Sequence, residues 1–516
     1  RTGVAGVAKD KGTVDHIVLD DLYVHDVDGN VINKHMANGG IYFIVEKPTD
    51  ENATGASKFN DLTIENCSVV TTNRWGIAAA YTYAWAQLNS AHLNEAALEK
   101  YASSNVTIQN NYIKAAGGDA ITTMYVDQPL VQYNVAEDCS RQMNPTDYPS
   151  GWQRVAAGIW PWKCKDSVFQ YNECYNNQYA YHGNGDGQAW DADWTDGTLY
   201  QYNYSHGNSR GAIMFCGAEA VNTTFRYNIS ENELTGPLDL PGNPDAHIYN
   251  NTFYMNENIK SIFDRTGGNA VLENNIFYYG GSTPLNQNWY PGGTLQYDNN
   301  LYYNFANTPS GDKNAVVVNA GTKVLEDAGS GPSSNTSGIA YIKENASVFD
   351  GYKLAEDSPA INAGKVITDN NGYDLEHDFF GHALTDIPEI GAAESDYVTV
   401  TATSNVYNVA NDQISGLAKH TTVKELLKNL KIDSNAQVTV KSGDKVLAEN
   451  DVVNSGCTVT ISYGEKSKTY TIVASSDCEL KSTVYMMTGT TIKIPSTEKN
   501  PATVSEVKQN VKTSST

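Results

Sequence analysis

The sequence predicts an all-β protein whose main part is a right-handed parallel β-helix, followed by a small β-rich module with one helix. Two observations predict the solenoid. A short motif that ends in asparagine recurs through the first 300 residues, and its later copies are spaced by about 23 to 25 residues, which suits one coil of three short strands. A change of composition near residue 396 predicts the module, because asparagine becomes rarer there while lysine, valine and threonine become commoner.

The recurring motif is an apolar or aromatic residue, two polar or aromatic residues and then asparagine. Asparagine tolerates the left-handed turn conformation, and its amide can bond the equivalent amide one coil above and below. Such a ladder would satisfy backbone groups that a turn otherwise leaves unpaired. The motif ends at Asn111, Asn134, Asn172, Asn203, Asn228, Asn251, Asn275 and Asn300, and Cys67 takes the same place in an earlier copy.

The expected domains are a β-helix catalytic domain over residues 1–395, an accessory domain over 396–475 and a linker or the start of a further module over 476–516. Leu354–Gly364 and Pro388–Glu394 resemble the closing coils of secreted β-helix proteins, so we expect them to cover the last apolar layer. No matching N-terminal cap precedes Ile17–Tyr23, so that cap is either short or supplied by another polypeptide.

The accessory domain has legible local signals. Thr422 and Glu425 form a capping box that opens an expected amphipathic helix from Val423 to Leu430. Alternating or β-branched segments predict strands that follow this helix, at Ala436–Lys441, Thr458–Tyr463 and Thr469–Val473.

The composition excludes several classes of protein. The chain has 35 basic and 59 acidic residues, a net charge of -24, which disfavours a protein that tracks nucleic-acid phosphates. Its seven cysteines lack zinc spacing and are expected to be buried thiols. No apolar run reaches 18 residues, so no transmembrane helix is expected. Starting at Arg1 without a signal peptide, the chain reads as a processed product that works outside the cell or attached to its surface.

The repeat register also predicts an outward face. Counting back from the asparagines aligns Ile121, Ile159 and Trp190 on one strand of successive coils, and these three are expected in the core. Their neighbours would then point outward as two ladders beside a groove, with the loop 138–155 and the helical insertion 84–102 as walls. The expected outward residues are Thr122, Met124, Trp160, Trp162, Asp191 and Asp193.

The segment from Tyr181 to Gly197 concentrates the reactive groups, with four Asp, one His, two Trp and four Gly in 17 residues. Glycoside hydrolysis needs two carboxyl groups in different surroundings, one protonated and one ionised. Asp193 would lie on a rigid strand beside Trp162, while Asp186 would sit in a glycine turn that can fold it over the groove. Trp160 and Trp162 are candidates for a platform under the apolar face of a sugar.

Other interpretations of these residues stay open. An Asp-x-Asp pattern with flanking Gly also binds calcium through oxygen ligands, so a structural calcium ion is one alternative and solvated turns are another. Trp160 and Trp162 could instead pack against a loop. His182 and His206 are more often satisfied polar residues than acid–base groups.

Two rival functions also remain. A polysaccharide lyase acting on a uronate polymer would need a base together with a cation such as Arg210, Lys163 or Lys165. A non-catalytic surface adhesin would only bind glycans through the aromatic groove, and fold alone does not choose among the three.

The asparagine ladder, the Gly-Asp186-Gly turn and a second aspartate seven residues later, within Trp-Asp-Ala-Asp193-Trp, resemble the lacto-N-biosidases of glycoside hydrolase family 136. The resemblance spans roughly residues 1 to 395. It implies a retaining hydrolase that needs no catalytic cofactor and releases lacto-N-biose (Galβ1-3GlcNAc) from lacto-N-tetraose, a human-milk-type glycan. It also implies a dedicated chaperone or partner domain for folding, which suits the unclear N-terminal cap.

The resemblance implies the roles of the site residues. Asp186 takes the acid/base role and Asp193 the nucleophile role, and retention requires their carboxyl groups to lie about 5 to 5.5 Å apart. Asp186 must then have a raised pKa, which the neighbouring charges of Asp191 and Asp193 could provide. The substrate-binding residues that it implies are Trp160, Trp162, Tyr181, His182, Gln188, Asp191 and Trp194.

Overall fold

The computed structural model describes residues 2–28, 38–89, 92–142, 155–178, 186–333, 346–368, 371–385, 387–395, 397–433, 435–464, 466–473, 480–481, 486–488, 491–493 and 512–513. The chain forms two compact units, Arg1–Tyr397 and Val398–Thr516. We describe each unit by itself. The boundary falls two residues after the one expected from composition, and most of the expected linker over 476–516 lies outside the described residues.

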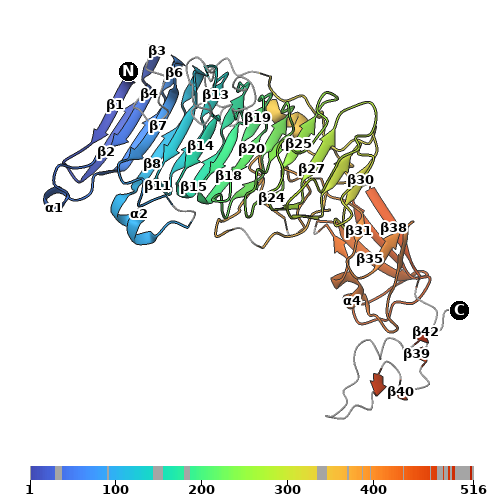
Figure 1. Ribbon diagram of the computed structural model, residues 1–516. Helices are drawn as coiled ribbons and strands as arrows, with labels where there is room; N and C mark the ends of the chain where they lie inside the picture. Colours follow the sequence, from blue (N-terminus) through green and yellow to red (C-terminus); the bar gives the residue numbers. More distant parts are fainter. Residues whose placement is uncertain are drawn as a thin grey trace. The chain divides into compact units, whose positions relative to one another are not determined.

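The first unit contains three long parallel sheets, and in most coils the chain visits them in turn and adds one strand to each (Figure 1). This order is consistent with a parallel β-helix. The first sheet contains β1 (Thr2–Ala8), β4 (Gly39–Val45), β7 (Trp75–Thr82), β10 (Ile121–Met124), β14 (Ile159–Trp162), β17 (Trp190–Asp193), β20 (Ile213–Cys216) and β23 (Leu238–Asp239).

The second and third sheets have 11 strands each. The second contains β2 (Thr13–Asp20), β5 (Lys58–Glu65), β8 (Ser103–Gln109), β11 (Val126–Asp127), β12 (Leu130–Gln132), β15 (Lys165–Gln170), β18 (Asp196–Gln201), β21 (Thr224–Arg226), β24 (His247–Tyr249), β26 (Ala270–Glu273) and β28 (Leu295–Asp298). The third contains β3 (Tyr23–Val27), β6 (Ser68–Thr72), β9 (Tyr112–Ala116), β13 (Val135–Glu137), β16 (Glu173–Tyr175), β19 (Tyr204–His206), β22 (Ile229–Glu231), β25 (Thr252–Met255), β27 (Ile276–Tyr279), β29 (Leu301–Tyr303) and β30 (Val316–Val318).

The predicted asparagine ladder is present and runs in one direction. In each coil the backbone N–H and the amide nitrogen of the ladder asparagine donate to the amide oxygen of the next, as from Asn203 to Asn228 and from Asn228 to Asn251 at 2.9 to 3.0 Å. The ladder starts at the Cys67 N–H, which donates to Asn111. It ends at Asp312, whose carboxylate accepts hydrogen bonds from the backbone N–H and the side-chain amide of Asn300. An ionised carboxylate has no N–H or O–H group to donate, so the ladder goes no further.

The left-handed turn residue is not the ladder asparagine, and here the sequence prediction is wrong. The residue just before it has positive φ, as at Tyr202 (56°), Tyr227 (49°) and Asn250 (51°). Only some of these positions hold asparagine. Tyrosine fills several others and its rings stack between coils, as between Tyr133 and Tyr171, whose centroids lie 4.8 Å apart. Ring stacking and burial therefore compensate a conformation that costs tyrosine energy.

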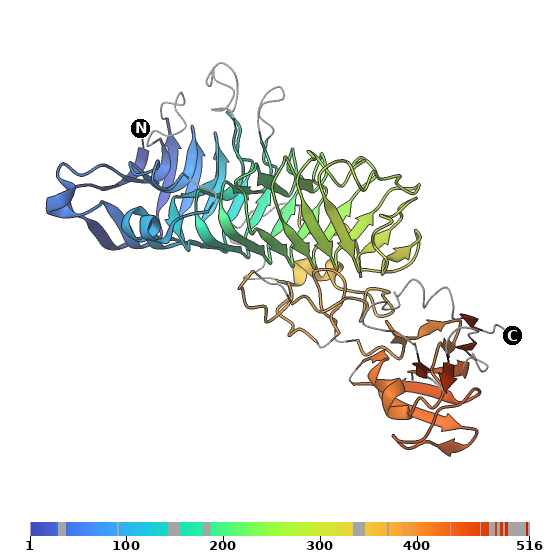
Figure 2. The same ribbon diagram turned by 60° about the horizontal axis from the view of Figure 1, so that its bottom comes forward.

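The segments expected to close the solenoid pack along its outside instead. Leu354, Ala360 and Ile390 belong to a buried cluster with outward tyrosines of the sheets such as Tyr202 and Tyr249. The described part of the chain between β30 and residue 395, including the 3-10 helix Ala346–Tyr352, lies along one side of the solenoid (Figure 2). The expectation that these segments cover the last apolar layer is therefore wrong, because the tyrosine rungs offer them an apolar surface along the side.

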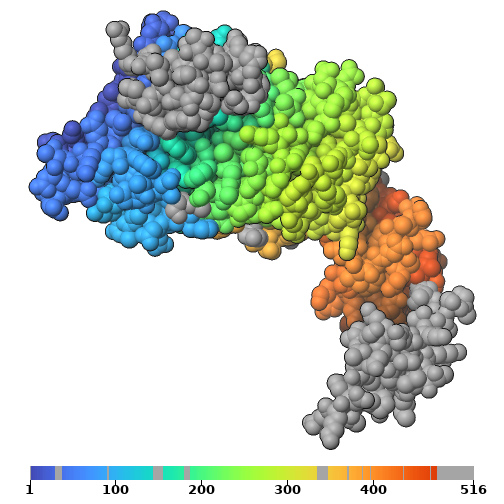
Figure 3. Space-filling model, viewed as in Figure 1, coloured from blue at the N-terminus to red at the C-terminus, as the bar shows by residue number. Residues whose placement is uncertain are grey.

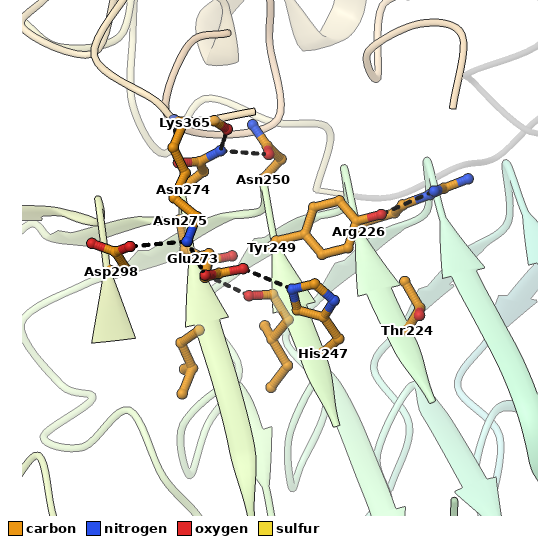
Figure 4. Close-up of polar contacts among 12 residues, drawn as sticks. Thr224, Arg226, His247, Tyr249, Asn250, Glu273, Asn274, Asn275, Asp298 and Lys365 are labelled. Atoms are coloured by element: carbon orange, nitrogen blue, oxygen red, sulfur yellow. Dashed lines mark hydrogen bonds and ion pairs between the residues drawn. The ribbon is translucent and has the colours of Figure 1, made fainter. Parts of the chain in front are cut away.

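Polar contacts fasten this outer segment to the second sheet (Figure 4). Lys365 pairs with Glu273 and with Asp298, the latter at 2.9 Å. Asn274 exchanges side-chain hydrogen bonds with the Lys365 backbone and donates to Asn250 at 3.1 Å. These contacts span separate coils, so the segment ties neighbouring strands together.

Two short helices project from the coils, α1 (Glu51–Thr54) and α2 (Glu95–Tyr101). The insertion that carries α2 protrudes from the solenoid surface (Figure 3). Of the helical insertion predicted over residues 84–102, only Glu95–Tyr101 is helical among the described residues. Among the described cysteines all thiols are free, and all are buried except the partly exposed Cys216. No helix among the described residues is long and apolar enough to cross a membrane.

The second unit has its own core and contains the predicted helix, α4 (Val423–Lys428), with the Thr422–Glu425 capping box. Its largest sheet consists of β32 (Asn408–Ala410), β33 (Gln413–Ser415), β38 (Lys466–Val473), β37 (Thr458–Tyr463), β35 (Gln437–Ser442) and β36 (Lys445–Val446). The shorter pairs are β31 (Ala402–Thr403) with β34 (Lys431–Ile432), β39 (Leu480–Lys481) with β42 (Lys512–Thr513), and β40 (Met486–Thr488) with β41 (Thr491–Lys493).

Candidate functional site

The candidate site lies on the outward side of the first sheet, between β10 and β23. Ile121 pairs with Ile159, and Ile159 with Trp190, in the predicted register, and all three belong to the main core. Because side chains alternate along a strand, the residues beside them face outward as two rows. The first row is Thr122, Trp160, Asp191, Met214 and Asp239, and the second is Met124, Trp162, Asp193 and Cys216.

Three potential ligand groups of neighbouring strands meet at the centre of this face. One side-chain oxygen each of Asp191 and Asp193 and the Cys216 sulfur lie within 4.8 Å of one another. Asp191 is 3 % exposed, and burial, followed by the charges of Asp193 and Asp186, raises the pKa of its carboxyl well above the usual range. Burial and these neighbouring charges therefore favour the neutral form of Asp191 over the ionised form.

Asp186 lies in the turn before β17 and faces an ion pair between the partly exposed Arg265 and the buried Asp239. Its Oδ1 is 3.4 Å from Nη2 of Arg265, and the same guanidinium nitrogen is 2.5 Å from Oδ2 of Asp239. Asp239 is fully buried and also accepts a hydrogen bond from Nε2 of Gln188 at 2.5 Å. Asp186 therefore has the Arg265 guanidinium beside it and the Asp239 carboxylate on the other side of that guanidinium.

Asp193 has different surroundings. On the neighbouring strand Cys216 is its register partner, and burial, followed by the charges of Asp193 and Asp191, raises the pKa of that thiol well above its usual range. Lys163 is 1 % exposed and its ammonium lies 3.4 Å from the centre of the Trp194 ring. Burial lowers the pKa of Lys163 to about 8, against the raising effect of Glu219 and Asp193. The two predicted catalytic carboxyls thus occupy unlike environments on one face.

The two candidate sugar-platform residues differ in the structure. Trp160 is 2 % exposed, and its indole N–H donates to Asp119 at 3.0 Å, so it presents no open ring face. For Trp160 the structure favours packing beneath the insertion, the alternative left open by the sequence. Trp162 is partly exposed and lies against Tyr81 and Tyr125, with ring centroids 6.2 and 5.5 Å away.

The remaining predicted subsite residues fall into three groups. Gln188 is fully buried, which makes it a supporting residue of the turn rather than a surface for a sugar. Trp194 is 36 % exposed at the edge of the site. Tyr181 and His182 lie outside the described residues.

Sequence reasoning missed Asp239, Arg265 and Cys216. Asp239 and Cys216 could have been found from the register. Continuing the first outward row by two coils from Asp191 reaches Asp239, and continuing the second row by one coil from Asp193 reaches Cys216. Arg265 lies beyond the last strand of the first sheet, where the register gives no signal.

The cations and histidine weighed for other roles are dispersed. Arg210 is in a partly buried pair with Asp264 at 2.6 Å. Lys165 belongs to β15 of the second sheet. Burial lowers the pKa of His206 to about 4, and the ring stacks on Tyr175, so His206 is a neutral packing residue. Only Lys163 among them adjoins the acidic cluster.

The one group of described residues that could hold a metal ion is Asp191, Asp193 and Cys216. This donor set fits calcium poorly, since calcium takes six to eight oxygen ligands and a thiol is a soft ligand. The ammonium of Lys163, whose charge interacts with Asp193 and Cys216, further opposes a bound cation.

Comparison with known proteins gives a consistent result. The chain is 47% identical over 474 residues to a curated lacto-N-biosidase of Bifidobacterium longum subsp. longum. Native and selenomethionine crystal structures of a GH136 lacto-N-biosidase from Eubacterium ramulus match 55% of this chain at 44% identity, with a TM-score of 0.51. The resemblance to the family 136 lacto-N-biosidases is confirmed.

The extent of these matches differs between the two partners. The aligned region is 85% of this chain but 30% of the B. longum lacto-N-biosidase, and 45% of the E. ramulus lacto-N-biosidase structures. The chain therefore spans less than half the length of these lacto-N-biosidases. No protein-family model matches the chain.

Proposed function

We propose that the first unit is a glycoside hydrolase that releases lacto-N-biose from lacto-N-tetraose-type glycans. The observation that carries this proposal is the pair of carboxyl groups in unlike surroundings, Asp186 beside Arg265 and Asp193 beside Cys216, on one rigid face. Two such carboxyls are what glycoside hydrolysis requires. The similarity to lacto-N-biosidases supports the choice of substrate.

In the proposed mechanism Asp193 attacks the anomeric carbon of the GlcNAc unit while Asp186 protonates the departing oxygen. Asp186 then takes a proton from water, which hydrolyses the glycosyl-enzyme with net retention. Burial raises the pKa of Asp191, which favours its neutral form beside the nucleophile. Exposed Trp194 and partly exposed Trp162 supply ring surface at the edge of the site, and no metal enters the mechanism.

The test is incubation with lacto-N-tetraose, with products separated by chromatography. We expect lacto-N-biose and lactose, and NMR of the first product should show the anomeric configuration of the cleaved bond. Asp193→Asn and Asp186→Asn should each lower kcat by about 10³-fold or more. Asp444→Asn, an exposed change in the second unit, is the matched control and should leave turnover unchanged.

Other outcomes identify the rival functions. If the released lacto-N-biose has the opposite anomeric configuration, the reaction inverts, and Asp193 would act as a general base rather than as the nucleophile. An ultraviolet-absorbing product from a uronate polymer would identify a lyase in which Lys163 serves as the cation. Glycan binding without turnover, unchanged in Asp193→Asn, would identify an adhesin.

We further propose that the solenoid is right-handed, as parallel crossover connections almost always are, and that it works outside the cell or on its surface, in keeping with the net charge of -24. The first coil leaves Val7, Val18 and Tyr23 from 52% to 67% exposed. A partner domain or dedicated chaperone that covers this coil would bury these side chains.

A further inference from the structure

Asp239 and Arg265 form an ion pair that reaches Asp186 from behind the acidic cluster. We propose that these two residues are positioning residues of the reaction, which hold the Asp186 carboxyl in place and keep the charge beside it balanced. This inference rests on the proposed acid/base role of Asp186.

The contacts fix the turn from two sides. Nε of Arg265 lies 2.9 Å from both oxygens of Asp239, and Nη2 lies 2.5 Å from Oδ2, so the guanidinium is held by three contacts in a fixed plane. Its Nη2 also lies 3.4 Å from Asp186. Asp239 additionally binds Gln188, two residues after Asp186 in the chain. One buried carboxylate thus restrains Asp186 both through the guanidinium and through the backbone of its own turn.

The pair also solves an electrostatic problem. A general acid must begin the reaction protonated, but a lone guanidinium 3.4 Å away would favour its ionised form. Asp239, fully buried behind the guanidinium, offsets part of that positive charge at the position of Asp186. Arg265 can then orient Asp186 without strongly favouring loss of its proton.

Other charged and titratable groups among the described residues also lie near this turn, and one of them is Lys163, whose charge interacts with Asp193 and Cys216. Asp191, Asp193 and the Cys216 thiol face Asp186 from β17 and β20. Beyond Asp239 lie Asp264 and Arg210, which pair with each other and together add little net charge. Because the Arg265 guanidinium lies 3.4 Å from Asp186, changes to the Asp239–Arg265 pair should shift the response of Asp186 to pH.

The test compares pH profiles of kcat/KM on lacto-N-tetraose for two opposite charge changes. The alkaline limb reports the acid of the free enzyme. Asp239→Asn leaves an uncompensated guanidinium beside Asp186, so this limb should move to lower pH. Arg265→Gln removes the guanidinium and leaves the Asp239 carboxyl behind it, so the limb should move to higher pH. Each variant should also lower kcat at the wild-type optimum by about 10²-fold, because the carboxyl is displaced.

Controls separate positioning from folding. Glu326→Gln and Lys323→Gln remove the same charges from an exposed pair and should leave the profile unchanged. Arg265→Lys keeps the charge, so its alkaline limb should stay near the wild-type position although kcat falls. Circular dichroism identifies variants that fail to fold. If a charge-removing variant fails to fold, the pH profile of Arg265→Lys is compared with that of the wild type instead.

The possible results are distinct. Opposite shifts of the alkaline limb support the proposal. Shifts in the same direction, or lower rates with no shift, would overturn it and leave the pair with a structural role only. If Asp186→Asn retains turnover, the proposed acid/base assignment fails first, whatever the pair does.

Discussion

Replacing one rung of the asparagine ladder should destabilise the whole solenoid measurably. Asn228 is 1% exposed, and its side chain accepts two hydrogen bonds from Asn203 and donates three, to Tyr200, Arg226 and Asn251. Asn228→Ala removes all five. At about 1–3 kcal/mol for each buried group left without its partner, the Asn203 N–H and the two backbone carbonyls together give a loss of about 3–9 kcal/mol.

Urea unfolding followed by tryptophan fluorescence measures this loss selectively, because all eight tryptophans lie in the first unit. Asn258→Ala changes an exposed asparagine outside the ladder and should alter the free energy of unfolding by about 0.5 kcal/mol or less. A loss below about 1 kcal/mol for Asn228→Ala would refute the view that the ladder amides are obligatory partners of the turn backbone.

Two further predictions concern buried charges. Burial raises the pKa of Glu233 from 4.5 to about 8 in a site where its carboxyl accepts from Asn208, so the resulting stability is complete below pH 4.5 and is lost as pH rises through 8. The urea midpoint of Glu233→Gln minus that of the wild type should therefore be larger at pH 9 than at pH 6. The same difference at both pH values would contradict this prediction. Asp119→Asn leaves the fully buried Arg74 guanidinium without its anion, at 2.7 Å in the wild type, and should cost about 3–5 kcal/mol in urea unfolding. The exposed control Glu326→Gln should cost about 1 kcal/mol at most, and an equal cost for both changes would rule out burial as the reason.

Much of the fold could be predicted from the sequence because its determinants repeat. The asparagine motif identified the ladder, and counting from it aligned Ile121, Ile159 and Trp190 correctly. The capping box of Thr422 and Glu425 was also legible, because both partners lie within one helical turn. In each case the physical cause lies within one repeat or one turn of chain.

The candidate site was only partly predictable. The register placed Asp191 and Asp193 on the outward face, and glycine flanks marked Asp186 as a turn residue. The exposure of an outward side chain could not be predicted from the register, because it depends on which segments pack over the strand. Trp160 points outward as expected and is nevertheless buried, which no periodicity reveals.

The sequence by itself determined the repeat and its register, and it singled out Asp186 and Asp193 as candidates, since alternation along a strand and turn chemistry are local properties. Only the tertiary structure decided which residues carry positive φ, where the segments after β30 pack and which charges meet at Asp186. Arg265 and Asp186 are 79 residues apart in sequence and 3.4 Å apart in space. Stacked coils bring distant residues together, and pairwise electrostatics act over that short distance.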